Sequence, residues 1–272
     1  MSSIRIAAIQ MTSTNDTQAN LAQAHELIQE AATQNKADLV ALPETFSFIG
    51  STPAEWLAGA QRMQDTTVES LREWAIEFDV WILAGSVALR GPKASNRIRN
   101  TSLLFSNEGE LIASYDKIHL FDADYPIEHP NRESKVFIAG KRPVVAKTPF
   151  GKLGLSICYD LRFPELFRKL SSAGAEIIFT PAAFTEVTGK AHWDVLTRAR
   201  AIENQVYLVA PAQHGSPAPG RPTFGHTRII DPWGRVIAER LQGPGVVWAD
   251  IDFDEIARIR QTLPALKNRR LK

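Results

Sequence analysis

The chain of 272 residues contains only one cysteine, Cys158. A single cysteine cannot form an internal disulfide, and it excludes a zinc site built from several cysteines. Structural disulfides belong mainly to oxidising compartments, so their absence favours the reducing cytoplasm. The composition therefore predicts a cytoplasmic protein with one free thiol.

Long apolar runs and an excess of charge of one sign are also missing. No stretch approaches the roughly 18 apolar residues of a membrane helix, and the N-terminal segment lacks a signal-peptide pattern. Basic and acidic residues nearly cancel, 31 against 30, so no strong field attracts nucleic acid or an anionic membrane. The basic end, residues 267–272, is expected to be solvated. These features leave a small molecule as the expected partner.

Metal-binding patterns are absent as well. The histidines are not spaced as in an HExxH zinc site, and we expect them to be structural. This expectation covers His119, His129, His192, His214 and His226. Neither a metal nor an organic cofactor is predicted.

The sequence does contain enough apolar material for a large core, since 44% of its residues are hydrophobic and 22% are charged. No linker interrupts it, so one globular domain over residues 1–272 is expected. The Gly- and Pro-rich segment 215–222 is expected to be a surface loop.

Strand-like runs alternate with helical patterns, which is typical of an α/β protein. Strands are expected in IRIAAIQ, DLVAL, WILAGSVAL, TSLLFS, LIASYD, PVVAKT, KLGLSI, EIIFT and VYLVAPA. Helices are expected over residues 16–34, 66–78, 164–174 and 191–204 and from about residue 254. Hairpin turns are expected at 107–110, 150–151 and 231–234. Because several strands are apolar throughout, both faces of each sheet should be buried. The predicted fold class is α/β, a four-layer αββα sandwich.

Cys158 directly follows an apolar strand, and Pro164 is well placed to begin a helix. A strand-to-helix turn is where α/β enzymes expose a nucleophile. The positive end of a nearby helix would favour the reactive thiolate. An unpaired cysteine can also be a small buried core residue, so its position alone leaves both interpretations open.

Glu44 and Lys117 also follow strand-like runs, in ADLVALPE and ELIASYDK. The carboxyl ends of strands are where open α/β sheets place their ligands. A partly desolvated carboxylate can serve there as a general base, and a lysine can stabilise a developing oxyanion. Taken singly, each side chain could equally be a solvated group at a strand end.

Together, the segments LPETFSF, YDKIHLFD and GLSICYDLRFPE resemble the nitrilase superfamily of carbon-nitrogen hydrolases along almost the whole chain. The resemblance implies Glu44 as general base, Lys117 as oxyanion stabiliser and Cys158 as nucleophile. It also implies an αββα sandwich, no cofactor, and a homodimer or higher homo-oligomer. We expect the backbone N–H of Tyr159, directly after the nucleophile, to be a second oxyanion donor.

The family has a second glutamate between the lysine and the cysteine. The matching residue here is Glu133, with Glu128 as a nearby alternative. Arg162 and Glu165 are expected to brace the turn after Cys158 through buried ion pairing. Residues 184–193 follow a strand end and could line the pocket or belong to the core or a dimer contact.

Residues 181–213 are similar to the Nit group of this superfamily. That likeness implies an amidase cleaving a small α-keto-acid amide through a cysteine thioester, with deaminated glutathione preferred. An omega-amidase acting on α-ketoglutaramate is the alternative, and a nitrilase is a weaker one. A catalytically silent scaffold of the same fold is the non-enzymatic alternative.

Overall fold

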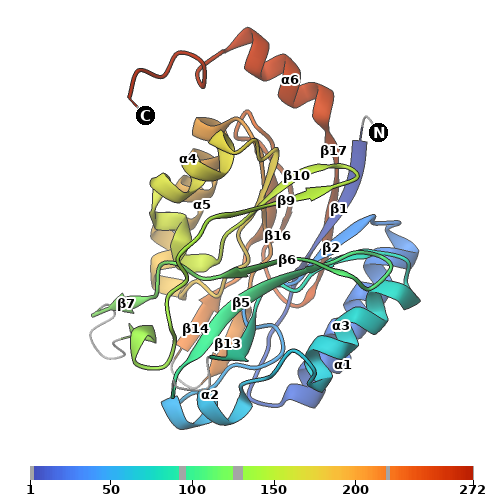
Figure 1. The fold of residues 1–272 in the computed structure, drawn as a ribbon, viewed down its shortest axis with the longest axis vertical. Coiled ribbons are helices and arrows are strands. Elements are labelled where there is room, and N and C mark those ends of the chain that lie inside the picture. The colour runs from blue at the N-terminus through green and yellow to red at the C-terminus, as the bar shows by residue number, and fades with distance from the viewer. Residues whose placement is uncertain (1–2, 92–95, 125–130, 219–220, 272) are drawn as a thin grey trace.

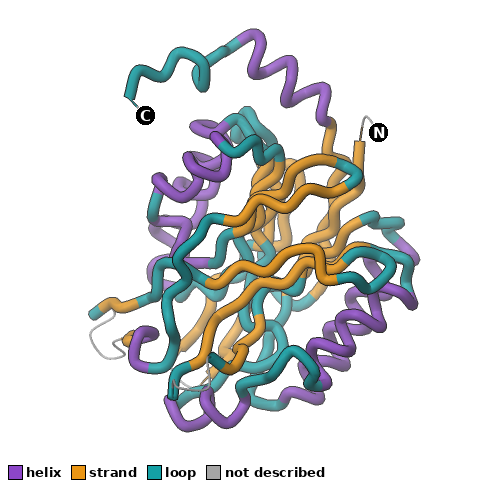
Figure 2. The backbone as a smooth tube through the Cα atoms, in the orientation of Figure 1, coloured by secondary structure: helices purple, strands orange, loops and turns teal. Residues whose placement is uncertain are grey.

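The computed structural model describes residues 3–91, 96–124, 131–218 and 221–271 (Figure 1). Two β-sheets face each other, and helices flank them on their outer sides, as the purple and orange segments of Figure 2 show. The layers are helix, sheet, sheet and helix. This arrangement is the predicted αββα sandwich.

The first sheet has the strand order β17-β1-β2-β3-β5-β4, with β6 paired to β5. Strands β1, β2 and β3 are parallel, and the others pair antiparallel. Its strands are β1 (Ser3–Gln10), β2 (Leu39–Ala41), β3 (Trp81–Leu83), β4 (Val87–Arg90), β5 (Ile98–Phe105), β6 (Leu111–Asp116) and β17 (Gly245–Asp252). Helices α1 (Thr17–Gln29) and α3 (Thr66–Glu77) cover its outer face, and α1 continues into a π-helical turn, Glu30–Gln34.

The second sheet has the order β16-β15-β12-β11-β10-β9, with β10, β11 and β12 parallel. Its strands are β9 (Val144–Thr148), β10 (Gly151–Leu155), β11 (Ile177–Phe179), β12 (Tyr207–Ala210), β15 (Thr227–Ile230) and β16 (Val236–Arg240). Helices α4 (Pro164–Ser172) and α5 (Glu186–Asn204) pack on it.

Shorter elements complete the chain. They are α2 (Pro53–Gly59), α6 (Phe253–Thr262), the pairs β7 (Asp122–Ala123) with β8 (Asn131–Arg132) and β13 (His214–Ala218) with β14 (Arg221–Phe224), and the 3₁₀ turns Glu133–Lys135 and Cys158–Arg162. None of the helices in the described ranges is long and apolar enough to cross a membrane.

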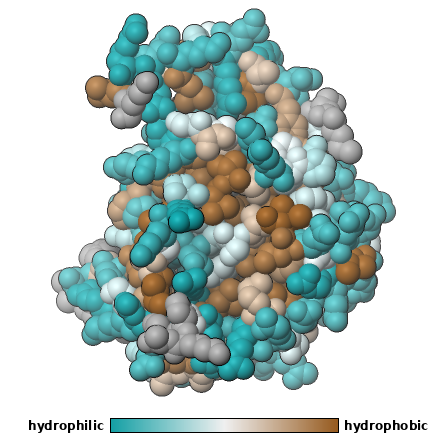
Figure 3. All heavy atoms as spheres, in the orientation of Figure 1, coloured by the Kyte–Doolittle hydropathy of each residue, from teal (hydrophilic) through white to brown (hydrophobic). Residues whose placement is uncertain are grey.

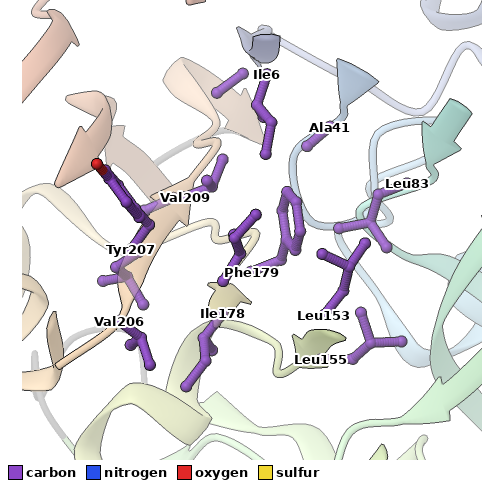
Figure 4. Close-up of a cluster of buried hydrophobic side chains, with 14 of the residues drawn as sticks. Ile6, Ala41, Leu83, Leu153, Leu155, Ile178, Phe179, Val206, Tyr207 and Val209 are labelled. Carbon is purple, nitrogen blue, oxygen red and sulfur yellow. The ribbon is translucent and has the colours of Figure 1, made fainter. Parts of the chain in front are cut away.

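Side-chain alternation in the strands explains the continuous apolar runs. In β2, Leu39 and Ala41 belong to the core between the sheets, while Val40 belongs to the core under α1 and α3. Figure 4 shows the first of these cores, where Leu83 of the first sheet lies opposite Leu153 of the second. Full burial of a leucine or isoleucine stabilises a fold by about 1.5–3 kcal/mol, so these contacts hold the two sheets together.

The prediction of one continuous strand in WILAGSVAL is wrong. The segment forms β3 and β4, which pair antiparallel with two different stretches of β5, residues 104–105 and 98–101, and are separated by a break around Gly85. Gly85 has φ +53°, and a Cβ there would lie 2.2 Å from the Leu42 carbonyl oxygen and 2.1 Å from that of Pro43. Only glycine allows this close approach, which the apolar character of the run conceals.

Two other predicted boundaries need correction. The helix expected from residue 191 begins at Glu186, because Thr185 caps it by accepting a hydrogen bond from Thr188 N. The segment expected to be a surface loop at 215–222 contributes instead to the antiparallel pair β13 and β14, as far as its residues are described. The predicted hairpins at 107–110, 150–151 and 231–234 are confirmed.

The space-filling view in Figure 3 shows apolar side chains gathered near the middle of one face, over the region of β6 and β9. Leu111 and Ile112 of β6 are among the exposed large hydrophobic residues. This face lies at the edges of both sheets.

Candidate active site

The structure brings Glu44, Lys117 and Cys158 together from three strand ends. They follow β2, β6 and β10, respectively, so two come from the first sheet and one from the second. All three line a cavity of about 600 Å³, a size within the usual range of small-molecule sites. The structure thus places the three residues named from the sequence around one cavity, and their catalytic roles stay predictions.

Lys117 lies at the base of this cavity with 2% of its surface exposed. Its Nζ donates to Glu44 Oε1 at 2.9 Å and to Glu133 Oε2 at 2.9 Å. Burial alone would lower the pKa of Lys117, but the two carboxylates and Cys158 outweigh it and raise that pKa well above its usual value. The lysine is therefore held as an ammonium ion.

Glu44 is fixed by donors from both sheets. Its Oε1 accepts from Lys117 and from Asn100 Nδ2, the latter at 3.0 Å, and its Oε2 accepts from the Ala183 backbone N–H at 2.9 Å. Burial of a carboxylate is tolerated when such partners satisfy its oxygens. The orientation of Glu44 thus depends on the packing of one sheet against the other.

Glu133 lies on the other side of the lysine. It receives both the Lys117 ammonium and the Phe121 backbone N–H, the latter at 2.6 Å, and it shares Asn100 Nδ2 with Glu44. This geometry favours Glu133 as the second glutamate. The alternative, Glu128, lies outside the described residues.

Cys158 opens the 3₁₀ turn after β10 with φ +46°, a left-handed conformation that is uncommon for a residue with a Cβ. Its backbone N–H donates to Pro181 O at 2.8 Å, which holds the turn. Burial and the Glu44 carboxylate raise the pKa of the Cys158 thiol well above its usual value, although Lys117 opposes them. The expectation of a thiolate favoured by a helix end is therefore wrong, and a base must remove the proton.

Asp160 connects the 3₁₀ turn that begins at Cys158 to β6 and the residues after it through hydrogen bonds. Its fully buried carboxylate accepts from Tyr115 Oη at 2.7 Å, from Ile157 N at 2.9 Å and from His119 N at 3.0 Å. His119 Nδ1 also lies 2.6 Å from Asp160 Oδ1. Sequence reasoning missed this role, although an acidic residue two places after the nucleophile was a visible signal.

Ser86 and Gln213 support the segment around Glu44. Ser86 Oγ accepts from Thr45 N at 2.9 Å. Gln213 Nε2 donates to the Glu44 carbonyl at 3.0 Å and to Ser13 Oγ at 2.8 Å. Neither contact could be predicted, because their partners are distant in sequence.

Segment 184–193 is divided between the cavity wall and the core, the two locations considered for it from the sequence. Thr185, Glu186 and Val187 line the cavity, whereas Phe184 and Trp193 are buried with ring centroids 4.9 Å apart. The apolar part of the cavity wall also includes Ile49, Trp56, Phe121, Val136 and Phe137.

The prediction that Arg162 and Glu165 brace the turn after Cys158 through buried ion pairing is wrong. Glu165 is exposed at the start of α4, while the Arg162 guanidinium lies over the rings of Tyr159 and Phe184 and 3.2 Å from His192 Nδ1.

The described histidines make side-chain contacts with other protein groups. His119 contacts Asp160, His192 contacts Arg162, and His226 Nδ1 lies 3.0 Å from Glu239 Oε1. His129 lies outside the described residues. Within the described part of the chain, no three His, Cys, Asp or Glu side chains cluster as metal ligands.

The chain belongs to the carbon-nitrogen hydrolase family, whose profile matches residues 5–261. This match confirms the predicted family and class of enzyme. That residues 1–272 form one domain stays a prediction.

Individual relatives agree with this assignment. The chain is 45% identical over 265 residues to a deaminated glutathione amidase from Synechocystis sp. (strain PCC 6803 / GT-S), covering 97% of each chain. Saccharomyces cerevisiae Nit3, described as a member of branch 10 of the nitrilase superfamily, shares 32% identity and a TM-score of 0.89, covering 99% of this chain and 97% of that one.

An amidase from Nesterenkonia sp. AN1 provides a chemical comparison. It shares 27% identity with this chain at a TM-score of 0.82, covering 99% of this chain and 95% of that one. Its structure, of a variant with glutamine in place of a glutamate, shows the acetamide moiety of fluoroacetamide added covalently at the active-site cysteine.

Proposed function

We propose that the protein hydrolyses an amide bond of a small α-keto acid through a thioester on Cys158. The observation that carries this proposal is the buried contact of Glu44 with Lys117, together with a thiol whose pKa depends on both of them. The family assignment adds the reaction class.

In the acylation step, Glu44 accepts the thiol proton while the Cys158 sulfur attacks the amide carbonyl carbon. The carbonyl π electrons move to oxygen and form a tetrahedral oxyanion. Lys117 and the Tyr159 backbone N–H are the proposed donors to that oxygen. Of the three Lys117 contacts, the one to Glu133 Oε1 is the longest, at 3.2 Å, so that proton is the one proposed to turn toward the oxyanion.

Collapse of the intermediate breaks the C–N bond, and the amine leaves with the proton that Glu44 held. Water then attacks the thioester, and Glu44 accepts its proton. A second tetrahedral intermediate releases the carboxylic acid and returns the proton to the Cys158 sulfur. Glu133 keeps Lys117 charged and oriented throughout both steps.

Deaminated glutathione is the proposed substrate, because several relatives that match nearly all of this chain are named for it. The cavity of about 600 Å³ suits a peptide-sized amide. α-Ketoglutaramate, the substrate of an omega-amidase, is the second candidate, and nitriles are third.

The test is the ratio of kcat/KM for deaminated glutathione and α-ketoglutaramate, measured on one preparation with Cys158→Ala as the blank. A clear preference for deaminated glutathione supports the proposal, while a preference for α-ketoglutaramate makes the protein an omega-amidase. No turnover of either amide, together with no covalent adduct from a haloacetamide, supports the silent scaffold.

We also propose that the protein is a homodimer and works in the cytoplasm. Val195 and Ile202 on the outer side of α5 are 66% and 50% exposed, and Trp233 of the neighbouring turn is 56% exposed. Such an apolar surface is typical of a contact between copies. A reducing compartment would keep the nucleophile as a free thiol.

Light scattering on Val195→Asp tests the dimer, with Ile76→Asp as a matched control. Ile76 is 56% exposed on α3, on the other side of the sandwich. A dimeric wild type that becomes monomeric only through Val195→Asp supports the proposed surface. A monomeric wild type contradicts it.

A further inference from the structure

Lys135 places a positive charge at the mouth of the cavity. It lines the cavity wall and is exposed, and within the described part of the chain no carboxylate forms an ion pair with it. The other cations of the wall are paired with carboxylates, since Lys117 binds Glu44 and Glu133, and Arg132 pairs with Asp124.

The acidic residues of the cavity do not compensate Lys135. Glu44 and Glu133 are engaged by Lys117 at the base. Glu186 on the wall forms its own ion pair with Lys190, at 2.6 Å. An anionic group entering the cavity would therefore find its accessible, uncompensated cation at the mouth and not beside the nucleophile.

The position of Lys135 is fixed relative to the reacting groups. It ends the 3₁₀ turn that begins at Glu133, and Glu133 O accepts from Val136 N at 3.0 Å and from Phe137 N at 2.8 Å. The same turn thus carries one side chain that reaches Lys117 at the base and another that lies at the mouth. This arrangement suits a substrate whose scissile bond lies at the base of the cavity and whose amine side ends in a negative charge at the mouth.

We propose that Lys135 binds the carboxylate at the amine-side end of a peptide-linked amide, an inference that rests on the proposed hydrolysis of α-keto-acid amides. A terminal amide such as α-ketoglutaramate has the same kind of acyl part but no carboxylate on its leaving amine. Lys135 therefore distinguishes peptide-linked amides from terminal ones. It is a specificity-determining residue, and it takes no part in bond making.

The first experiment compares both amides with wild type, Lys135→Gln and the control Lys147→Gln, which removes the same charge from the exposed side of β9 outside the cavity. Lys135→Gln should lower kcat/KM for deaminated glutathione about five- to tenfold, mainly through KM. The values for α-ketoglutaramate should not change, and Lys147→Gln should change neither. An equal loss for both amides, or no loss for either, overturns the assignment.

The second experiment measures binding without turnover. In a Cys158→Ala background, calorimetry compares deaminated glutathione with its C-terminal carboxamide. Lys135→Gln should weaken binding of the carboxylate form about five- to tenfold and leave the carboxamide unchanged. If wild type hydrolyses neither amide but this difference persists, the proposed reaction fails and the carboxylate site stands. Equal binding of both forms, or no binding of either, overturns the site.

Discussion

The backbone N–H of Ala183 donates to Glu44 Oε2 at 2.9 Å, although 139 positions separate the two residues. Glu44 follows β2 of the first sheet and Ala183 follows β11 of the second. The carboxylate is thus oriented by the opposite sheet. Catalytic geometry and sheet packing are therefore coupled in this fold.

Glu44→Gln should slow turnover about 10²- to 10⁴-fold, because the amide keeps the shape of the side chain but cannot accept a proton. Steady-state rates and the rate of thioester breakdown should both fall. The matched control is Glu69→Gln at a half-exposed position of α3, which should leave both unchanged. A folded Glu44→Gln protein with near-normal rates would show that another group is the base.

Lys117→Ala should raise the activation free energy by about 3–4 kcal/mol, which is a hundredfold or greater loss of rate. The change also leaves the buried Glu44 and the partly buried Glu133 without their cation, so the protein should melt at a lower temperature. Activity is measured below that melting temperature, with Lys147→Ala as control. Unchanged kcat and unchanged melting would contradict the assigned position of the ammonium ion.

Alkylation of Cys158 by iodoacetamide should accelerate as the pH rises through 9, since burial and Glu44 raise the pKa of the thiol. Glu44→Gln removes the carboxylate charge that raises the pKa of the thiol, so the pH dependence of alkylation should move to lower pH. A raised folded-state pKa means that stability is complete below the unfolded thiol pKa of about 8.5 and is lost as the pH rises through the folded value. A wild-type alkylation rate that levels off below pH 8 would contradict this.

Tyr115→Phe should lower the free energy of unfolding by about 1–3 kcal/mol, because it removes a donor from the fully buried Asp160 carboxylate. Tyr207→Phe is the matched control. Its hydroxyl donates to Glu255 at 2.8 Å, but Glu255 is also paired with Arg235. Chemical denaturation of both variants should show the larger loss for Tyr115→Phe. Equal losses would mean that Asp160 is satisfied without the tyrosine.

The sequence predicts most elements because hydrophobic periodicity is local. Strand β1, helix α3 and the hairpin of β5 and β6 have the expected positions. The errors arise where a distant contact decides the local structure. Gly85 breaks a run of strand-forming residues because the Leu42 and Pro43 carbonyls approach it, and nothing within the run reports that approach.

In the candidate site, too, local patterns predict some residues, whereas others depend on distant contacts. Glu44, Lys117 and Cys158 could be predicted, since each lies within three residues of the end of a strand and in a recognisable motif. Asn100 could not, because an asparagine inside β5 gives no sign that it faces two glutamates. The raised pKa of Cys158 was also hidden, since it depends on burial and on a carboxylate from the other sheet.

The thioester mechanism is tested most directly by turnover of Cys158→Ala, combined with intact mass spectrometry of acid-quenched wild type during hydrolysis of deaminated glutathione. Wild type should carry an acyl adduct on Cys158, and a Cys158→Ala protein with normal circular dichroism should show neither adduct nor turnover. Wild-type-like turnover by that folded variant would exclude Cys158 as the nucleophile.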